Sequence, residues 1–244
     1  MLTFLLEFFT HPYTQAVFAA LLPVVLLMAY ITYHDRKQPE PLKWLLKGVA
    51  YGVCSALIVI LFVGPLPSVC YMFGLDETTP LGQIATAFGQ AAIPEECAKL
   101  LMLWLLLRHN PYFDERFDGI VYAVCVGLGF AGLENILYVF SNLDELATIG
   151  ISRAIFAVPG HFFFAVAMGY FYSRAHFDMG RSKKVICYAA ALLVPILIHG
   201  VYDAILMVKT VADEVSGFLV IVFLVFCYYV QRYGRRRIHE LKNR

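Results

Sequence analysis

Long apolar runs limit what this chain can fold into more than any other feature of its sequence. There are about seven of them, over residues 13–33, 44–64, 84–107, 117–140, 149–173, 185–208 and 215–231. About 20 apolar residues suffice for a helix to cross a bilayer, and lipid cannot hydrogen-bond the backbone of a more open structure. Since 60% of the residues are hydrophobic and only 15% are charged, we predict an all-α, polytopic membrane protein. It would be a bundle of about seven transmembrane helices that forms a single domain over residues 1–244.

The Lys and Arg residues are concentrated in alternate connectors. Most of them lie in residues 34–43, 108–116, 174–184 and 232–244, whereas residues 65–82 and 141–148 contain Asp and Glu but no Lys or Arg. By the positive-inside rule, we predict a multi-pass protein of the cell membrane with its N-terminus outside and its C-terminus in the cytoplasm. We expect the lipid bilayer, and no nucleic acid, as a partner, although the net charge of +1 by itself says nothing about nucleic acid.

Three charged residues interrupt the third apolar run: Glu95, Glu96 and Lys99. Each would cost about 2.5–3.5 kcal/mol at the centre of a membrane helix, and such residues usually face a bundle interior or a water-filled cavity. Glu95 and Lys99 are four residues apart and share a helix face, so Lys99 can hold one carboxylate while the other remains free for chemistry. A purely structural ion pair is the alternative, but it would need only one carboxylate.

The next three apolar runs contain polar residues as well. They are Glu134 and Asn135 in the fourth run, Arg153 and His161 in the fifth, and His199 and Asp203 in the sixth. At a helical rise of about 1.5 Å per residue, Glu95, His161 and His199 all lie about 14–18 Å from the predicted outer boundary. Glu134 and Asp203 lie nearer that boundary. Each residue alone could be a structural interhelical contact, but their shared depth predicts one polar site between the third, fourth, fifth and sixth helices.

The fourth run also contains a stripe of small residues. Gly119, Ala123, Gly127 and Ala131 recur every four positions and therefore lie on one helix face. Small residues at this spacing allow the backbone of a neighbouring helix to approach closely, so we predict tight helix packing along this face.

The residue types of the polar site suit peptide-bond hydrolysis without a covalent intermediate. Glutamate and histidine are the usual general acids and bases, so a glutamate can activate water while two histidines hold the water or stabilise an oxyanion. This interpretation needs no cofactor. Zinc is the alternative, with Glu95, His161 and His199 as ligands and water in the fourth position. The HExxH signature of many zinc proteases is absent from the chain.

Five blocks of residues occur in a particular order between Tyr33 and Asp203. They are Asp35-Arg36 with Pro39-Glu40-Pro41; Glu95-Glu96-Cys97-Ala98-Lys99; Phe117-Asp118-Gly119-Ile120-Val121-Tyr122 with Gly127-Leu128-Gly129-Phe130-Ala131 and Glu134-Asn135; Arg153 with His161; and His199-Gly200-Val201-Tyr202-Asp203. Through these blocks the chain resembles the PrsW family of intramembrane proteases, which is itself related to the CAAX prenyl endopeptidases of the CPBP family.

The resemblance implies an intramembrane endopeptidase that performs site-1-type cleavage of membrane-anchored proteins, including anti-sigma factors. By resemblance, Glu95 and Glu96 fall on a paired-glutamate motif in which one residue activates the water, and His161 falls on the second motif. His199 and Asp203 fall on the third motif, which serves the oxyanion in the CAAX enzymes.

We therefore expect four catalytic residues and a set of supporting ones. The catalytic residues are Glu95, Glu96, His161 and His199, and the supporting residues are Lys99, Glu134, Asn135, Arg153 and Asp203. The expected substrate is a single-span membrane protein that is cut near the extracytoplasmic end of its span, because the site lies in the middle and outer half of the bilayer. The alternatives are a CAAX-type prenyl-protein endopeptidase, or a non-protease such as a proton-coupled transporter or a membrane scaffold. The sequence shows no repeated halves of the kind that transporters often have.

Overall fold

Helices form every regular element of the described chain. The structure, a computed structural model, describes residues 11–178 and 180–242, and within these ranges there is no β-strand. The longer helices are α2 (Pro12–His34), α3 (Leu42–Ile58), α6 (Ile93–Leu107), α7 (Asp118–Ser141), α9 (Val158–Phe177), α10 (Arg181–Val211) and α11 (Ser216–Lys242). The shorter ones are α4 (Val69–Phe73), α5 (Pro80–Thr86) and α8 (Leu146–Ser152). The π-helical segments are η1 (Val59–Val63), η2 (Ala87–Ala92) and η4 (Arg153–Ala157), and the 3₁₀ turns are η3 (Leu143–Glu145) and η5 (Asp213–Val215). The prediction of an all-α fold is confirmed.

Six helical stretches among the described residues are long and apolar enough to cross a membrane. They are Pro12–His34, Leu42–Val63, Asp118–Ser141, Leu143–Phe177, Lys183–Val211 and Ser216–Lys242. The predicted third run is different, although α5, η2 and α6 form one continuous helical stretch over it. Glu95, Glu96 and Lys99 make this stretch too polar to qualify by composition. All three side chains are buried inside the bundle, so their charges do not face lipid. The chain is a multi-pass membrane protein.

Helix α7 lies at the centre of the bundle and packs against α2, α3, α6 and α9. Its small residues allow a close approach of α9. A methyl group added at Gly119 would collide with Ser173 of α9, and one added at Gly127 would collide with Ala165. Conversely, a side chain at Gly169 would collide with the backbone of Gly119. The predicted close packing along the small-residue stripe is confirmed, and it keeps the polar residues of α9 next to those of α7.

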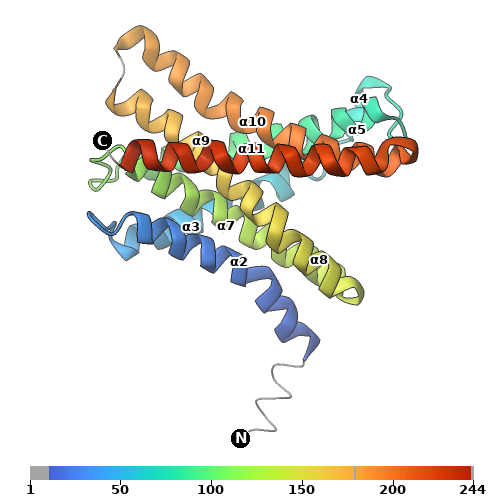
Figure 1. Cartoon of the computed structure of the whole chain (residues 1–244). Helices are drawn as coiled ribbons and strands as arrows, with labels where there is room; N and C mark the ends of the chain where they lie inside the picture. The colour runs from blue at the N-terminus through green and yellow to red at the C-terminus, as the bar shows by residue number, and fades with distance from the viewer. Residues whose placement is uncertain (1–10, 179, 243–244) are drawn as a thin grey trace, which may run out of the picture.

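The two ends of the bundle differ in the charge of their connectors. Figure 1 shows the end of α11, the end of α9 with the start of α10, and the α2–α3 connection at one end, with α4, α8 and the start of α11 at the other. The first end has connectors rich in Lys and Arg, and the second has the connectors 65–82 and 141–148, which have none. We call these the base-rich end and the base-poor end.

A group of carboxylates attaches the α2–α3 connector to α7 at the base-rich end. The backbone N–H of Glu40 donates to Asp35 Oδ2 at 3.1 Å, and the Tyr122 hydroxyl donates to Glu40 Oε2. Asp118, which begins α7, accepts from two backbone N–H groups of the preceding turn. Burial raises the pKa of Asp35 to about 7 and that of Glu40 to about 8. Two of the sequence blocks, around Asp35 and Asp118, therefore meet here, far along α7 from its polar residues at Glu134.

Candidate active site

Prolines shape the three helices that supply the predicted catalytic residues. Pro94 stands in α6 directly before the two glutamates, Pro159 stands in α9 two residues before one histidine, and Pro195 stands in α10 four residues before the other. A proline has no N–H to donate to the carbonyl four residues earlier. The turns before Pro94 and Pro159 are the π-helical segments η2 and η4, and such turns occur frequently at functional sites. These irregular turns set the direction in which the following side chains leave the helix.

The four predicted catalytic residues come together around Lys99. Glu95, Glu96, His161 and His199 are buried, and one ligand atom of each lies within 4.8 Å of those of the others. The Lys99 ammonium lies 3.2 Å from Glu95 Oε2, 2.9 Å from Glu96 Oε1 and 3.1 Å from His161 Nδ1. Lys99 thus holds both carboxylates, whereas the sequence suggested that one would stay free of it. We call these four residues with Lys99 the catalytic centre.

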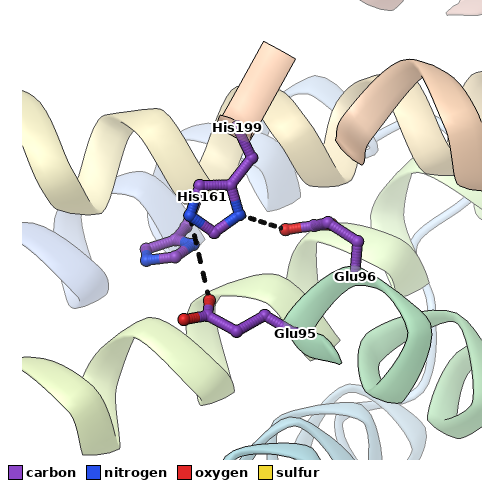
Figure 2. Close-up of side chains that lie close together, drawn as sticks. All are labelled: Glu95, Glu96, His161 and His199. Atoms are coloured by element: carbon purple, nitrogen blue, oxygen red, sulfur yellow. Dashed lines mark hydrogen bonds and ion pairs between the residues drawn. The ribbon is translucent and has the colours of Figure 1, made fainter. Parts of the chain in front are cut away.

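The imidazole of His199 bridges the two glutamates, as Figure 2 shows. Its Nδ1 lies 2.9 Å from Glu96 Oε1, and its Nε2 lies 3.9 Å from Glu95 Oε2. The same Nε2 lies 3.2 Å from Asp203 Oδ2, one helical turn further along α10. Asp203 is therefore a direct partner of the histidine, as their i, i+4 spacing indicated.

Residues of α7 and η4 hold the second imidazole from the other side. His161 Nε2 lies 3.0 Å from Glu134 Oε2, and the same carboxylate oxygen accepts from Arg153 Nη2 at 2.8 Å. Arg153 Nε also donates to Asn135 Oδ1 at 2.6 Å, while the Asn135 amide donates to the Ala20 carbonyl of α2. Glu134 is thus a partner of the imidazole rather than an isolated interfacial carboxylate. Asn135 does not reach the catalytic centre and instead ties this chain of contacts to α2.

The two imidazoles share one arrangement that suits a cation site. The Nε2 atoms of His161 and His199 face Glu134 and Asp203, two carboxylates outside the catalytic centre. Their Nδ1 atoms face Lys99 and Glu96, which belong to the centre. Carboxylates on the outer nitrogen orient the histidines of metal sites in the same way. Two carboxylates and two imidazoles are a donor set typical of zinc and related divalent ions. Glu96 Oε2 is buried without a hydrogen-bond partner among the described residues, and the Lys99 ammonium shows that these donors hold a positive charge. The residues present therefore fit a divalent metal ion.

A cavity of about 370 Å³ opens beside the catalytic centre. Glu95, His161 and His199 line it, together with Glu134, Arg153 and Asp203. Glu96 is absent from its wall and fully buried, whereas Glu95 is 8% exposed. Further lining comes from the last turns of α7 and α10 and from the early turns of α11. These are the helix halves at the base-poor end of the bundle, so the cavity lies in that half.

Several aromatic residues next to the catalytic centre were missed by the sequence reasoning. The Lys99 ammonium lies 3.9 Å from the centre of the Phe130 ring, and Phe164 stacks on the His199 imidazole at 4.8 Å between ring centres. Tyr138 lines the cavity. Helical spacing could have found Phe130 and Tyr138, because they stand four residues before and after Glu134 and share its helix face. They were overlooked because an aromatic residue in a membrane helix is usually explained by packing alone.

Comparison with known proteins finds one family model and several curated relatives that match most of the chain. The model of the PrsW family, described as intramembrane metalloproteases, matches residues 40–230. The chain is 37% identical over 191 residues to protease PrsW of Clostridioides difficile (strain 630), which is 78% of each chain. It is 35% identical over 191 residues to protease PrsW of Geobacillus kaustophilus (strain HTA426), or 78% of this chain and 79% of the relative. It is 32% identical over 224 residues to protease PrsW of Oceanobacillus iheyensis, or 91% and 95%. No solved structure matches the chain.

Proposed function

This chain belongs to the PrsW family of intramembrane proteases, and on that premise we propose that its catalytic centre cuts membrane-anchored proteins within or close to their transmembrane span. The observation that carries the proposal is the convergence of two buried glutamates and two buried histidines within 4.8 Å, beside a cavity of about 370 Å³. Isolated structural ion pairs do not need four titratable groups from three helices around one point. A water-accessible cavity beside such groups is what hydrolysis of a peptide bond requires.

We assign the activation of water to Glu95 rather than to Glu96. Glu95 lines the cavity and its side chain is reachable from it, whereas Glu96 is fully buried behind it. A general base must come within hydrogen-bond reach of the proton that it removes. Glu96 Oε1 is already shared between Lys99 and His199, which suits a residue that holds other groups in place.

We also propose that Glu96, His161 and His199 hold a divalent metal ion, with zinc as the first candidate. The family is described as a metalloprotease family. The donor set, the central ammonium and Glu96 Oε2, which has no hydrogen-bond partner within residues 11–178 and 180–242, all support a cation site. This favours the metal-containing alternative over the metal-free route that the sequence reasoning preferred. It also gives Glu96 the ligand role that was earlier considered for Glu95. When bound, such an ion would act as a Lewis acid that polarises the substrate carbonyl or makes bound water more acidic.

The remaining polar residues orient the two imidazoles and compensate the negative charge of the two glutamates. Glu134 accepts from His161 and Asp203 accepts from His199, which keeps the inner nitrogen of each imidazole directed at the catalytic centre. Arg153 in turn holds Glu134 in place. Lys99 compensates the charge of the two glutamates, which would otherwise be costly to bury together.

We further propose that the substrate is a single-span membrane protein that is cut toward the extracytoplasmic end of its span. The cavity lies in the half of the bundle with base-poor connectors, and the positive-inside rule assigns that half to the outside. An anti-sigma factor fits such a cut, whereas the prenylated tail of a CAAX substrate lies at the cytoplasmic face. Reporter fusions after Gly74 and after Arg237 test the orientation, because they should report opposite compartments. Reporting of one compartment by both would contradict it.

The decisive experiment is cleavage of a single-span substrate reconstituted with the protein in liposomes. Wild type should cut it, and mass spectrometry of the products should find the cut in the extracytoplasmic half of the span. Glu95→Gln keeps the size of the side chain but removes the base, so cleavage should fall by at least about a hundredfold. Glu145→Gln is the matched control, because Glu145 is an exposed glutamate of the base-poor connector 141–148.

The two variants separate the competing functions. Equal cleavage by Glu95→Gln and wild type would remove Glu95 from the catalytic role. Proton movement across the liposomes in the absence of cleavage would indicate a transporter instead. A cut in the cytoplasmic half of the substrate span would overturn the orientation, and with it the preference for membrane-anchored regulators over prenylated tails.

A further inference from the structure

The residues that line the cavity beside the catalytic centre include two chemically different sets. One set, the polar side, contains Glu95, Glu134, the two imidazoles and Arg153. The other set is four aromatic residues in ring contact with one another, Phe156, Phe164, Tyr202 and Phe223, which we call the aromatic wall. Only the polar side has a role in the hydrolysis described above, so the aromatic wall needs an explanation of its own.

The aromatic wall begins at the catalytic imidazoles and extends away from them as one connected set of rings. Phe164 stacks on the His199 imidazole with 4.8 Å between ring centres and an interplanar angle of 21°. The ring centres of Phe164 and Tyr202 are 5.8 Å apart, and those of Tyr202 and Phe223 are 5.0 Å apart. Phe156 closes the set at 5.4 Å from Phe223. The aromatic wall therefore lies next to the His199 imidazole of the catalytic centre, within the same cavity.

Packing from behind holds the wall rigid. Phe164, Tyr202 and Phe223 form one buried cluster that also contacts partly buried apolar residues of α10 and α11. The backbone of α9 comes close enough at Gly160 that an added methyl group would lie 3.4 Å from the Phe164 ring and 3.6 Å from the Tyr202 ring. Three of the four rings are at most 7% exposed. Rings fixed in this way cannot easily turn aside, so the space that they leave limits the size of what enters.

We propose that the aromatic wall is the specificity pocket of this protease and that it selects an aliphatic side chain on a substrate residue next to the scissile bond. The proposal rests on the proposed function, since it presupposes that the catalytic centre cuts a peptide bond. The rings favour an apolar side chain because they offer no charged partner. They disfavour an aromatic side chain because the cavity of about 370 Å³ must also hold the substrate backbone and a rigid wall does not yield to overpacking.

Phe223 is the residue through which this selection can be tested. It comes from α11, which supplies no predicted catalytic or supporting residue. Its removal enlarges the pocket without touching the polar side of the cavity. The test uses full-length protein in liposomes and a single-span substrate series with Ala, Leu, Phe or Asp at each of the two residues that flank the mapped cut.

We expect wild type to cleave the Leu substrate at least about tenfold faster, in kcat/KM, than the Phe or Asp substrate at one of these two positions. In Phe223→Ala, the ratio of Phe to Leu cleavage should rise about tenfold at that position. Phe218→Ala is the matched control, because Phe218 is an aromatic residue on the same helix that is 65% exposed and neither lines the cavity nor belongs to the cluster behind the aromatic wall. It should leave the ratio unchanged.

Each outcome distinguishes failure of the proposed specificity pocket from failure of the proposed protease function. Cleavage by wild type with an unchanged Phe-to-Leu ratio in Phe223→Ala would overturn the pocket while leaving the proposed function intact. Equal changes in Phe223→Ala and Phe218→Ala would also overturn it, since they would indicate a general effect of removing an aromatic side chain from α11. No cleavage of any substrate by folded wild type would overturn both. If Phe223→Ala does not fold, Phe223→Leu enlarges the pocket less and should shift the ratio in the same direction.

Discussion

Replacing Lys99 by methionine would keep most of the volume of the side chain but remove the ammonium from the catalytic centre. Lys99 is only 3% exposed, and its Nζ contacts Glu95 at 3.2 Å, Glu96 at 2.9 Å and His161 at 3.1 Å. Methionine can replace none of these contacts. Two buried carboxylates would then stand next to each other without the charge that compensates them.

The structure gives the size of the expected effect. Breaking a buried ion pair by removing one partner typically costs about 3–5 kcal/mol, because an uncompensated charge remains buried. Both carboxylate partners of Lys99 are affected here, and their side chains are 10% and 0% exposed, so little solvent screens them. Since 1 kcal/mol shifts the Tm of a domain of this size by about 2–4 °C, we expect the Tm of Lys99→Met to fall by about 10 °C.

Thermal unfolding of the purified protein in detergent, followed by intrinsic fluorescence, measures this effect. The double variant Lys99→Met with Glu96→Gln should recover part of the lost Tm, because it also removes one of the two uncompensated carboxylates. Lys209→Met is the control, since Lys209 is an exposed lysine at the end of α10 and surface substitutions usually change stability by less than about 0.5 kcal/mol.

The same variant also tests whether the catalytic centre binds a divalent cation. Without the competing ammonium, added Zn²⁺ should raise the Tm of Lys99→Met more than that of wild type, because a ligand that binds only the folded state stabilises it. The argument that Lys99 compensates the two buried carboxylates would be refuted if Lys99→Met lowers the Tm by less than about 2 °C. It would also be refuted if the double variant is less stable than the single one.

Three further outcomes follow from the structure. Glu134→Gln removes the carboxylate that orients the His161 imidazole, so cleavage and metal affinity should each fall by about 10- to 100-fold; unchanged values for both would exclude an orienting role. Chelation should abolish cleavage and added Zn²⁺ should restore it, whereas full activity after exhaustive chelation would rule out the proposed metal ion. Burial raises the pKa of Glu40 from 4.5 to about 8, so the folded state keeps a proton that the unfolded state releases. The stabilisation from this proton is complete below pH 4.5 and is lost as the pH rises toward about 8. The Tm of wild type should therefore decline across this window more steeply than that of Glu40→Gln, and identical slopes would contradict the assignment.

Local spacing was enough to find most of the polar site. Glu95 and Lys99 pair because residues four apart on a helix are neighbours, and His199 and Asp203 pair for the same reason. The common depth of Glu95, His161 and His199 followed from helical rise alone. These relations depend only on the geometry within one helix, or on the position of a residue along its span.

Relations between helices could not be obtained in this way. Which glutamate lines the cavity depends on how α6 is rotated, and the π-helical segment η2 before it changes that rotation. Glu134 was assigned a position near the outer boundary, but its contact with His161 depends on how closely α7 and α9 pack. Asn135, its neighbour in sequence, points toward α2 instead, because successive residues leave a helix about 100° apart.

The sequence by itself determined that this protein is a helical membrane protein, where its apolar runs lie and which polar residues they contain. These properties follow from the free energy that it costs to place polar groups in lipid. This cost applies to each transmembrane segment largely independently of its neighbours. Only the tertiary structure decided that Lys99 holds both glutamates, that Glu95 rather than Glu96 faces the cavity, and that an aromatic wall adjoins the catalytic imidazoles. Those features arise from the packing of side chains between helices, and one helix does not carry the information about how its neighbours are rotated and shifted against it.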